Sequence, residues 1–291
     1  MPRRGLPKSL IPYLLLAPTL VYMATFIGYP MIEALMLAFM DYRSGSLSLA
    51  NFAILSRDFH FWEALVFTFS LAAIIIPLQV ALALAVTLLL STRFRGSNAL
   101  LYTFTIPLTI SDVAAALIWY NILTGSGYLN RLLLNLGLME EPLHFFGYAH
   151  REMELLAIVI TEVWRATAIV FVILFAGFQM IGRDYIEAAE VFGASALQKL
   201  RYVILPLLKP SLQTALIIRT LFALQVFAVV WILAGRDIPI LAGEAYYWQV
   251  EIKNPHVAAA YALIIAASSM LLGWLYIKLL KPEYLERGAG I

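Results

Sequence analysis

Residues 183–206, RDYIEAAEVFGASALQKLRYVILP, form a polar, helix-favouring segment between two long apolar stretches. Asp184 with Glu187 three residues later is a capping-box pattern, with Asp in the place of Ser or Thr, and predicts that a helix begins here. The next residues favour a helix as far as Phe192, and Gly193 suits the left-handed position at which helices often end. The first half of the segment is therefore predicted to be a short helix closed by a glycine turn.

A second short helix is predicted to follow the glycine. Ser195 and Gln198 have the spacing of another capping box. We expect this helix to end before Pro206, because the residue before a proline is disfavoured in the helical conformation. The segment is rich in small residues, which let a second protein backbone approach closely: Ala188, Ala189, Gly193, Ala194 and Ala196. We favour a docking element over a helix that lies on the membrane surface.

The composition of the chain is that of a membrane protein. Apolar residues make up 62% of the 291 residues and charged residues 13%, whereas a soluble domain has roughly 45–50% apolar and about 25% charged residues. There is no cysteine, which excludes a disulfide framework and a cysteine nucleophile. The four histidines include no helical i, i+4 pair, so no metal site is expected. The net charge of +2 gives no argument for a nucleic-acid partner, and none is expected.

Six stretches are long and apolar enough to cross the bilayer as helices, which takes about 20 apolar residues each. They cover residues 12–38, 64–90, 98–122, 155–181, 207–234 and 257–280. The runs are continuous rather than alternating, which indicates helices and not barrel strands. The first run is too long for the apolar part of a signal peptide, so we expect it to be retained. Residues 1–291 are predicted to form one all-helical transmembrane domain.

The distribution of Lys and Arg predicts the orientation of the spans. With the N-terminus in the cytoplasm, twelve basic residues fall in cytoplasmic segments and six in external ones, in agreement with the positive-inside rule. The twelve are Arg3, Arg4, Lys8, Arg93, Arg95, Arg183, Lys199, Arg201, Lys209, Lys278, Lys281 and Arg287. Both termini and the loop 183–206 are therefore predicted to be cytoplasmic, in a multi-pass protein of the cytoplasmic (inner) membrane.

The segment 183–206 resembles the EAA loop of the transmembrane subunits of bacterial and archaeal ABC importers. The matching residues are Glu187, Ala188, Ala189, Gly193, Leu205 and Pro206. Two positions depart from the usual pattern: Val203 stands where Ile is usual, and Phe192 where Asp usually precedes the glycine. The resemblance implies a permease with a cytoplasmic helix-turn-helix coupling loop.

The resemblance also implies partners and a mechanism. In this family the first short helix docks into a groove on an ATP-hydrolysing subunit, which makes Glu187 a polar contact and Gly193 the turn. Closure of two ATPases on ATP would turn the membrane bundle outward, an alternating-access change. The implied partners are a second homologous permease, two ATPases and an extracytoplasmic solute-binding protein. ATP and Mg would be used by the ATPases, since this chain contains no Gly-Lys pair and hence no P-loop.

Further stretches are similar to the first permease subunit of the maltose-type, carbohydrate-uptake branch. They are Pro12–Pro18, Leu49–Phe52, Phe61–Leu65, Gly127–Asn130 and Arg219-Thr220. This similarity implies a disaccharide or oligosaccharide as the cargo, with glycerol-3-phosphate or a related polyol phosphate as the alternative. The sequence departs from the branch at Phe227-Ala228 and at Ala234–Asp237, both near the expected outer mouth.

Three charged residues, Asp112, Arg165 and Arg219, fall near the middle of predicted spans. Charges at this depth are costly and usually face a cavity or a partner. Glu162 lies one turn from Arg165, where an i, i+3 pair can form. We expect Asp112 to pair with Arg219 or Arg165 and to hold the bundle together. The alternatives are a contact with substrate or, in an ion-coupled secondary transporter, a protonation site at Asp112.

Sugars bind to aromatic faces and to polar groups that reach their hydroxyls. Gln225 and Trp231 are the favoured candidates for the substrate pathway, and Tyr120 and Asn121 are also available. No Gly-x-Ser-x-Gly or His-Glu-x-x-His motif is present, which favours a transport subunit over a membrane enzyme. Neither a membrane enzyme nor a secondary transporter would need the loop 183–206, and the inverted repeats typical of many secondary transporters are not visible.

Overall fold

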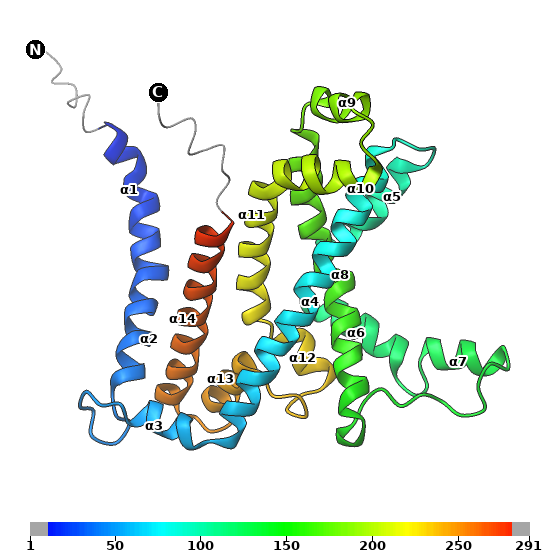
Figure 1. Ribbon diagram of the computed structural model, residues 1–291. Helices are drawn as coiled ribbons and strands as arrows, with labels where there is room; N and C mark the ends of the chain where they lie inside the picture. The colour runs from blue at the N-terminus through cyan, green and yellow to red at the C-terminus, as the bar shows by residue number, and fades with distance from the viewer. Residues whose placement is uncertain (1–10, 281–291) are drawn as a thin grey trace, which may run out of the picture. The chain divides into compact units, whose positions relative to one another are not determined.

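Helices make up the regular secondary structure of the residues that the computed structural model describes, 11–280, and turns and loops connect them (Figure 1). The only extended pairing within that range is an isolated bridge between Met40 and Leu47. The predicted all-α class is confirmed. The basic residues at the two ends of the chain, Arg3, Arg4, Lys8, Lys281 and Arg287, lie outside the described residues.

Unit 1, one of two compact units, comprises Met1–Asp58 and Ala245–Ile264. It holds α1 (Ile11–Met23), the π-helical turn η1 (Ala24–Gly28), α2 (Tyr29–Phe39), α3 (Ala50–Arg57) and parts of α13 (Leu241–Val250) and α14 (Pro255–Leu279). Unit 2 comprises Phe59–Glu244 and Ile265–Ile291. The single permease domain stays a prediction.

The end of α2 is held by two side chains from elsewhere in unit 1. The last carbonyls of a helix have no partner within the helix itself. Asn51 Nδ2 donates to the carbonyl oxygens of Ala38 at 3.0 Å and Met40 at 2.8 Å. His256 Nδ1 lies 2.9 Å from the Met40 oxygen and 3.1 Å from that of Leu37. These bonds connect α2, α3 and α14 into one unit.

Five helical segments of the described chain are long and apolar enough to cross a membrane. They are Pro12–Phe39, Phe59–Ser91, Tyr148–Gln179, Ala196–Leu224 and Pro255–Leu279. A sixth span results when the bent pair Ser97–Thr109 and Asp112–Asn135 is counted as one. The structure therefore has five or six candidate spans where the sequence predicted six.

The third predicted span, 98–122, is not one straight helix. α5 (Ser97–Thr105) runs into the 3-10 turn η2 (Ile106–Thr109), and α6 (Asp112–Leu123) starts after a bend of 108°. Ser111 caps the new helix, because its Oγ accepts from the Ala114 N–H at 3.2 Å. Asp112 is consequently the first residue of a helix, where the helix dipole favours a carboxylate.

The predicted helix-turn-helix is present in unit 2, with one correction at its start. α9 (Arg183–Val191) begins after Gly182 without a side-chain cap, two residues earlier than the Asp184–Glu187 capping box requires, so that capping prediction is wrong. Gly193 has a left-handed φ of +75°, as predicted. Ser195 and Gln198 form the predicted reciprocal capping box at the start of α10 (Ala196–Lys199).

The predicted stop before Pro206 is also wrong. α10 continues through the π-helical turn η4 (Leu200–Ile204) into α11 (Leu205–Leu224). The Leu205 N–H donates to the Leu200 oxygen in an i to i−5 bond, and Pro206 falls in the first turn of α11, where its missing N–H is tolerated. The predicted span 207–234 is interrupted instead at its other end, between α11 and α12 (Ala228–Leu233).

The core of unit 2 lies where α4 (Phe59–Ser91), α8 (Arg151–Gln179) and α11 pack together. One apolar cluster joins Ala83 and Leu90 of α4 to Phe171 of α8 and Ala215 of α11. The close approach of α8 and α11 depends on Gly177, since a Cβ there would lie 2.0 Å from Ser211 Oγ. α7 (Tyr128–Asn135) and η3 (Tyr148–His150) complete the unit.

Candidate functional site

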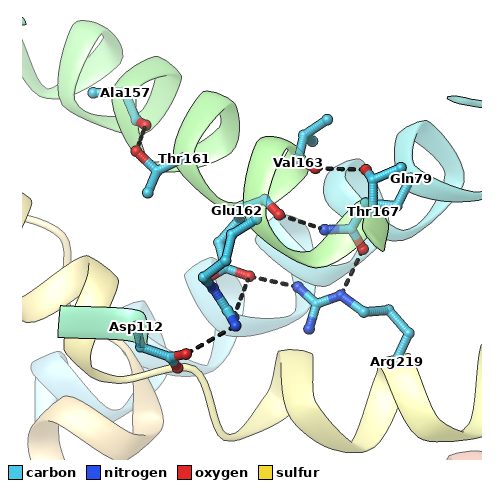
Figure 2. A network of polar contacts seen from close by, with 9 residues as sticks. Gln79, Asp112, Ala157, Thr161, Glu162, Val163, Thr167 and Arg219 are labelled. Carbon is cyan, nitrogen blue, oxygen red and sulfur yellow. Dashed lines mark hydrogen bonds and ion pairs between the residues drawn. The ribbon is translucent and has the colours of Figure 1, made fainter. Parts of the chain in front are cut away.

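A network of polar side chains crosses the apolar packing of α4, α8 and α11 (Figure 2). Arg219 of α11 donates from Nη2 to Glu162 Oε2 and from Nε to Gln79 Oε1, both at 2.5 Å. Gln79 of α4 donates from Nε2 to the backbone oxygen of Glu162 at 2.9 Å. One side chain from each of the three helices thus takes part in a closed set of hydrogen bonds.

The network continues from Glu162 towards α6. Arg165 Nη2 lies 3.2 Å from Glu162 Oε1, which confirms the predicted i, i+3 pair. Arg165 Nη1 lies 2.8 Å from Asp112 Oδ1. Of the two partners considered for Asp112, the structure therefore selects Arg165, whereas Arg219 pairs with Glu162.

The network is balanced in charge and graded in burial. Two carboxylates face two guanidinium groups, so no net charge is buried. The Glu162 and Arg219 side chains are 0% and 2% exposed, whereas the Asp112 side chain is 48% exposed. A buried ion pair is tolerated only when its remaining hydrogen-bonding atoms are also satisfied, which Gln79 does for Arg219. The Glu162–Arg219 end therefore joins the helices, and the Asp112–Arg165 end is open to a ligand.

A pocket of about 280 Å³ lies at the open end of the network. Its polar lining consists of Asp112, Arg165, Arg219 and Gln225, and apolar side chains such as Pro107 and Phe222 complete the wall. Gln225 follows the last residue of α11, where the helix breaks. A carboxylate, a guanidinium group and an amide around one cavity can donate to and accept from hydroxyl groups at the same time.

The other three predicted pathway residues do not line this pocket. Trp231 packs near Phe227, with ring centroids 5.6 Å apart. Tyr120 stacks near Phe146 at 4.9 Å. Asn121 Nδ2 donates to the Leu117 oxygen of its own helix. The structure therefore brings Gln225 together with Asp112, Arg165 and Arg219, and leaves the other three candidates apart.

The sequence interpretation missed Gln79 and the pairing of Glu162 with Arg219. Gln79 is a single amide within the apolar run of α4 and is fully buried. A buried amide requires hydrogen-bonding partners. Its isolation in an apolar helix was the available signal, but the sequence does not indicate which helix supplies the partner.

The helix-turn-helix forms a second candidate site, at the end of unit 2 opposite to α7 (Figure 1). Large apolar side chains are exposed there: Val191 is 85% exposed, Phe192 89% and Leu197 72%. Glu187, Ala188, Gly193 and Pro206 are also exposed, whereas Ala189 and Leu205 are half-buried. Lys199 Nζ pairs with Glu190 Oε1 at 2.6 Å and so connects the two short helices. Contiguous exposed apolar groups on a structured segment are typical of a binding surface.

Residues 79–281 match the family described as binding-protein-dependent transport system inner membrane component. The trehalose transport system permease protein SugA of Mycobacterium tuberculosis is 28% identical over 279 residues, which cover 92% of this chain and 87% of that protein. The trehalose/maltose transport system permease protein MalF of Thermococcus litoralis is 33% identical over 190 residues, or 65% of this chain and 63% of that protein.

A solved structure shows the same fold. A chain in the crystal structure of a bacterial alginate ABC transporter, in complex with an alginate pentasaccharide-bound periplasmic protein, has a TM-score of 0.80 at 21% identity and covers 94% of both chains. The family match spans most of the sequence and includes the polar network and the helix-turn-helix. The chain therefore belongs to the binding-protein-dependent transport system inner membrane components, and it is a multi-pass inner-membrane permease of an ABC importer.

Proposed function

We propose that the chain forms half of the translocation pathway of an ATP-driven importer for a disaccharide or an oligosaccharide. A second homologous permease would form the other half, and an extracytoplasmic solute-binding protein would deliver the sugar. The proposal is supported by relatives named as trehalose and trehalose/maltose permeases. The observation that carries it is the pocket that contains Asp112, Arg165 and Gln225.

The charge balance of this pocket favours a neutral sugar over a polyol phosphate. Arg165 would be the natural partner of a phosphate, but the carboxylates of Asp112 and Glu162 already pair with it. A phosphate would have to compete with both carboxylates and would be repelled by them. Sugar hydroxyls, in contrast, can bond to the Gln225 amide and the free oxygen of Asp112 without disturbing the pair.

Coupling to ATP hydrolysis is assigned to α9 and the glycine turn. Glu187 on the exposed face of α9 would contact the ATPase, and Ala188 and Ala189 would let the ATPase approach closely. Gly193 would shape the turn, and Leu205 and Pro206 would connect it to α11. The exposed Val191 and Phe192 supply the apolar area that such a docking contact needs. ATP and Mg would be bound by the two partner ATPases.

Uptake kinetics of the complete complex test the cargo and the pocket together. In vesicles that contain the complex, loaded binding protein and labelled sugar, Gln225→Ala should raise the apparent KM for transport or lower the maximal rate. Asn121→Ala removes an amide that, within the described residues, bonds only to Leu117 of its own helix, and it should leave both unchanged. Unchanged kinetics for Gln225→Ala would remove Gln225 from the pathway, and stimulation by a polyol phosphate instead of sugars would overturn the assignment of the cargo.

Asp112→Asn separates a pathway role from a structural one. The amide keeps the volume of the side chain but weakens its pairing with Arg165. If Asp112 contacts the substrate, the complex should assemble normally and lose uptake. Loss of the assembled complex would show that the pair serves to hold the bundle together.

A further inference from the structure

A second, larger pocket of about 880 Å³ lies at the end of unit 2 that carries α9. It lies between the last turns of α4 and α8 and the beginning of α10. Figure 1 shows α9, α10 and the connection from α4 to α5 gathered at this end. Ser91 and Gln179, the last residues of α4 and α8, line the pocket. The pocket is therefore placed at the ends of two candidate membrane spans.

The lining of the pocket combines apolar side chains with basic ones. Leu88, Phe175 and Phe178 line the part that lies within the spans. Arg93 and Arg183 line the part beyond the ends of α4 and α8, together with apolar residues such as Ile186, and Lys199 lines the pocket from α10. This arrangement matches the two parts of a phospholipid, an apolar chain and a charged headgroup.

Arg93 and Arg183 are the basic lining residues whose charge no ion pair within the described residues neutralises. Lys199 is neutralised by Glu190, which lines the same pocket. Arg93 and Arg183 are exposed, and neither takes part in an ion pair within the described chain. Arg95 lies in the same short loop as Arg93 but does not line the pocket.

Arg93 has an unusual backbone conformation for an arginine. Its φ is +51°, in the left-handed region that favours glycine. The residue follows the end of α4, where glycine is the common choice because it has no Cβ to clash. A non-glycine side chain at a strained backbone position motivates the hypothesis that the side chain takes part in binding.

We propose that this pocket binds an anionic phospholipid, with the headgroup phosphate between Arg93 and Arg183 and an acyl chain along Leu88, Phe175 and Phe178. Guanidinium groups bind phosphate oxygens through paired, charge-assisted hydrogen bonds. Basic pockets at the membrane surface select anionic headgroups, and each arginine contributes about a factor of five in affinity. The bound lipid connects the end of α4 to the start of α9. The proposal does not depend on which cargo is carried.

The test uses the purified complex after removal of its native lipid. Short-chain phosphatidylglycerol, short-chain phosphatidylcholine and inorganic phosphate are titrated separately, with native mass spectrometry to count bound molecules. Phosphatidylglycerol should bind more tightly than phosphatidylcholine, and Arg93→Gly and Arg183→Gln should each weaken it about fivefold. Arg95→Gln and Arg201→Gln, which remove exposed basic residues outside the pocket, should leave the affinity unchanged.

Arg93→Gly also distinguishes a loss of lipid binding from a loss of folding. Glycine relieves the strain at this position, so the variant should melt no lower than the parent protein while it loses lipid. Equal binding of the two lipids, equal binding of inorganic phosphate, or unchanged affinity in both pocket variants would each overturn the proposal. These outcomes are independent of sugar uptake, so failure here is distinguishable from failure of the proposed cargo.

Discussion

Replacement of Glu162 by glutamine is the most direct perturbation of the network that joins α4, α8 and α11. The carboxylate pairs with Arg219 through Oε2 and with Arg165 through Oε1. A glutamine retains one acceptor oxygen but turns its NH₂ group towards the other guanidinium. The variant therefore leaves two arginines with Asp112 as their only counter-ion in the network, and Arg219 is the buried one.

The size of the expected loss of stability follows from the burial of Arg219. Removal of one partner of a buried ion pair costs about 3–5 kcal/mol, because the remaining charge is uncompensated. A change of 1 kcal/mol shifts the melting temperature of a protein of about this size by roughly 2–4 °C. We therefore expect Glu162→Gln to lower the melting temperature of the purified protein by roughly 6–20 °C.

Glu154→Gln is the matched control in the same helix. Glu154 is also buried, but its Oε1 accepts only from the Gly147 N–H and it takes part in no ion pair within the described residues. Glutamine preserves that acceptor, so the loss should be less than about 1 kcal/mol. Thermal unfolding followed by intrinsic fluorescence in one detergent compares the two variants. Equal melting temperatures for Glu162→Gln and Glu154→Gln would refute the reasoning.

Three further variants test local features of the structure. Gly177→Ala should separate α8 from α11 and lower the free energy of unfolding by about 1–3 kcal/mol. Thermal unfolding should show this loss, and the second change Ser211→Gly should restore part of it. An unchanged melting temperature for Gly177→Ala would mean that the close approach of the two helices is absent. Asn130→Leu removes three hydrogen bonds to Thr124 and Leu143 and should destabilise the segment after α6 by about 1–3 kcal/mol. A protease should therefore cleave this segment faster in the variant, and an unchanged rate of cleavage would contradict the prediction. Ser195→Ala should cost about 1 kcal/mol at the start of α10, measured as faster amide exchange in that turn, and equal exchange would show that the cap contributes nothing.

Local sequence patterns predicted the features that depend on neighbouring residues. The apolar runs gave the candidate spans, Gly193 gave the left-handed turn, and Ser195 with Gln198 gave a helix start. The Glu162–Arg165 pair was also predictable, because residues three apart on a helix face each other. In each case the deciding contact lies within a few residues of the pattern.

Contacts between residues far apart in the sequence could not be predicted from local patterns. Gln79 and Arg219 are 140 residues apart, and their bond depends on how α4 and α11 pack. The same limit applies to the pocket, whose lining includes Gln225 together with residues of the network but not Trp231. Sequence identified polar groups in the spans without indicating which of them share a cavity.

Two of the wrong helix boundaries, at Pro206 and within the predicted span 98–122, have a common cause. Pro206 was expected to stop a helix, but the π-helical turn before it shifts the hydrogen bonds by one residue and places the proline where its N–H is not needed. Ser111 was overlooked inside an apolar run, although it caps α6 and allows the chain to bend. Both features depend on hydrogen bonds of backbone N–H groups that a hydropathy pattern does not reveal.

ATP hydrolysis by the assembled complex tests the central claim most directly. The permease should co-purify with a second permease and two ATPases, and hydrolysis should rise when a sugar-loaded binding protein is added. Glu187→Lys on α9 should abolish that rise, whereas Asn98→Lys, which adds a positive charge at the same end of unit 2 outside α9, should not. A permease that purifies without ATPase activity, and whose uptake in vesicles follows a proton gradient instead, would contradict the account.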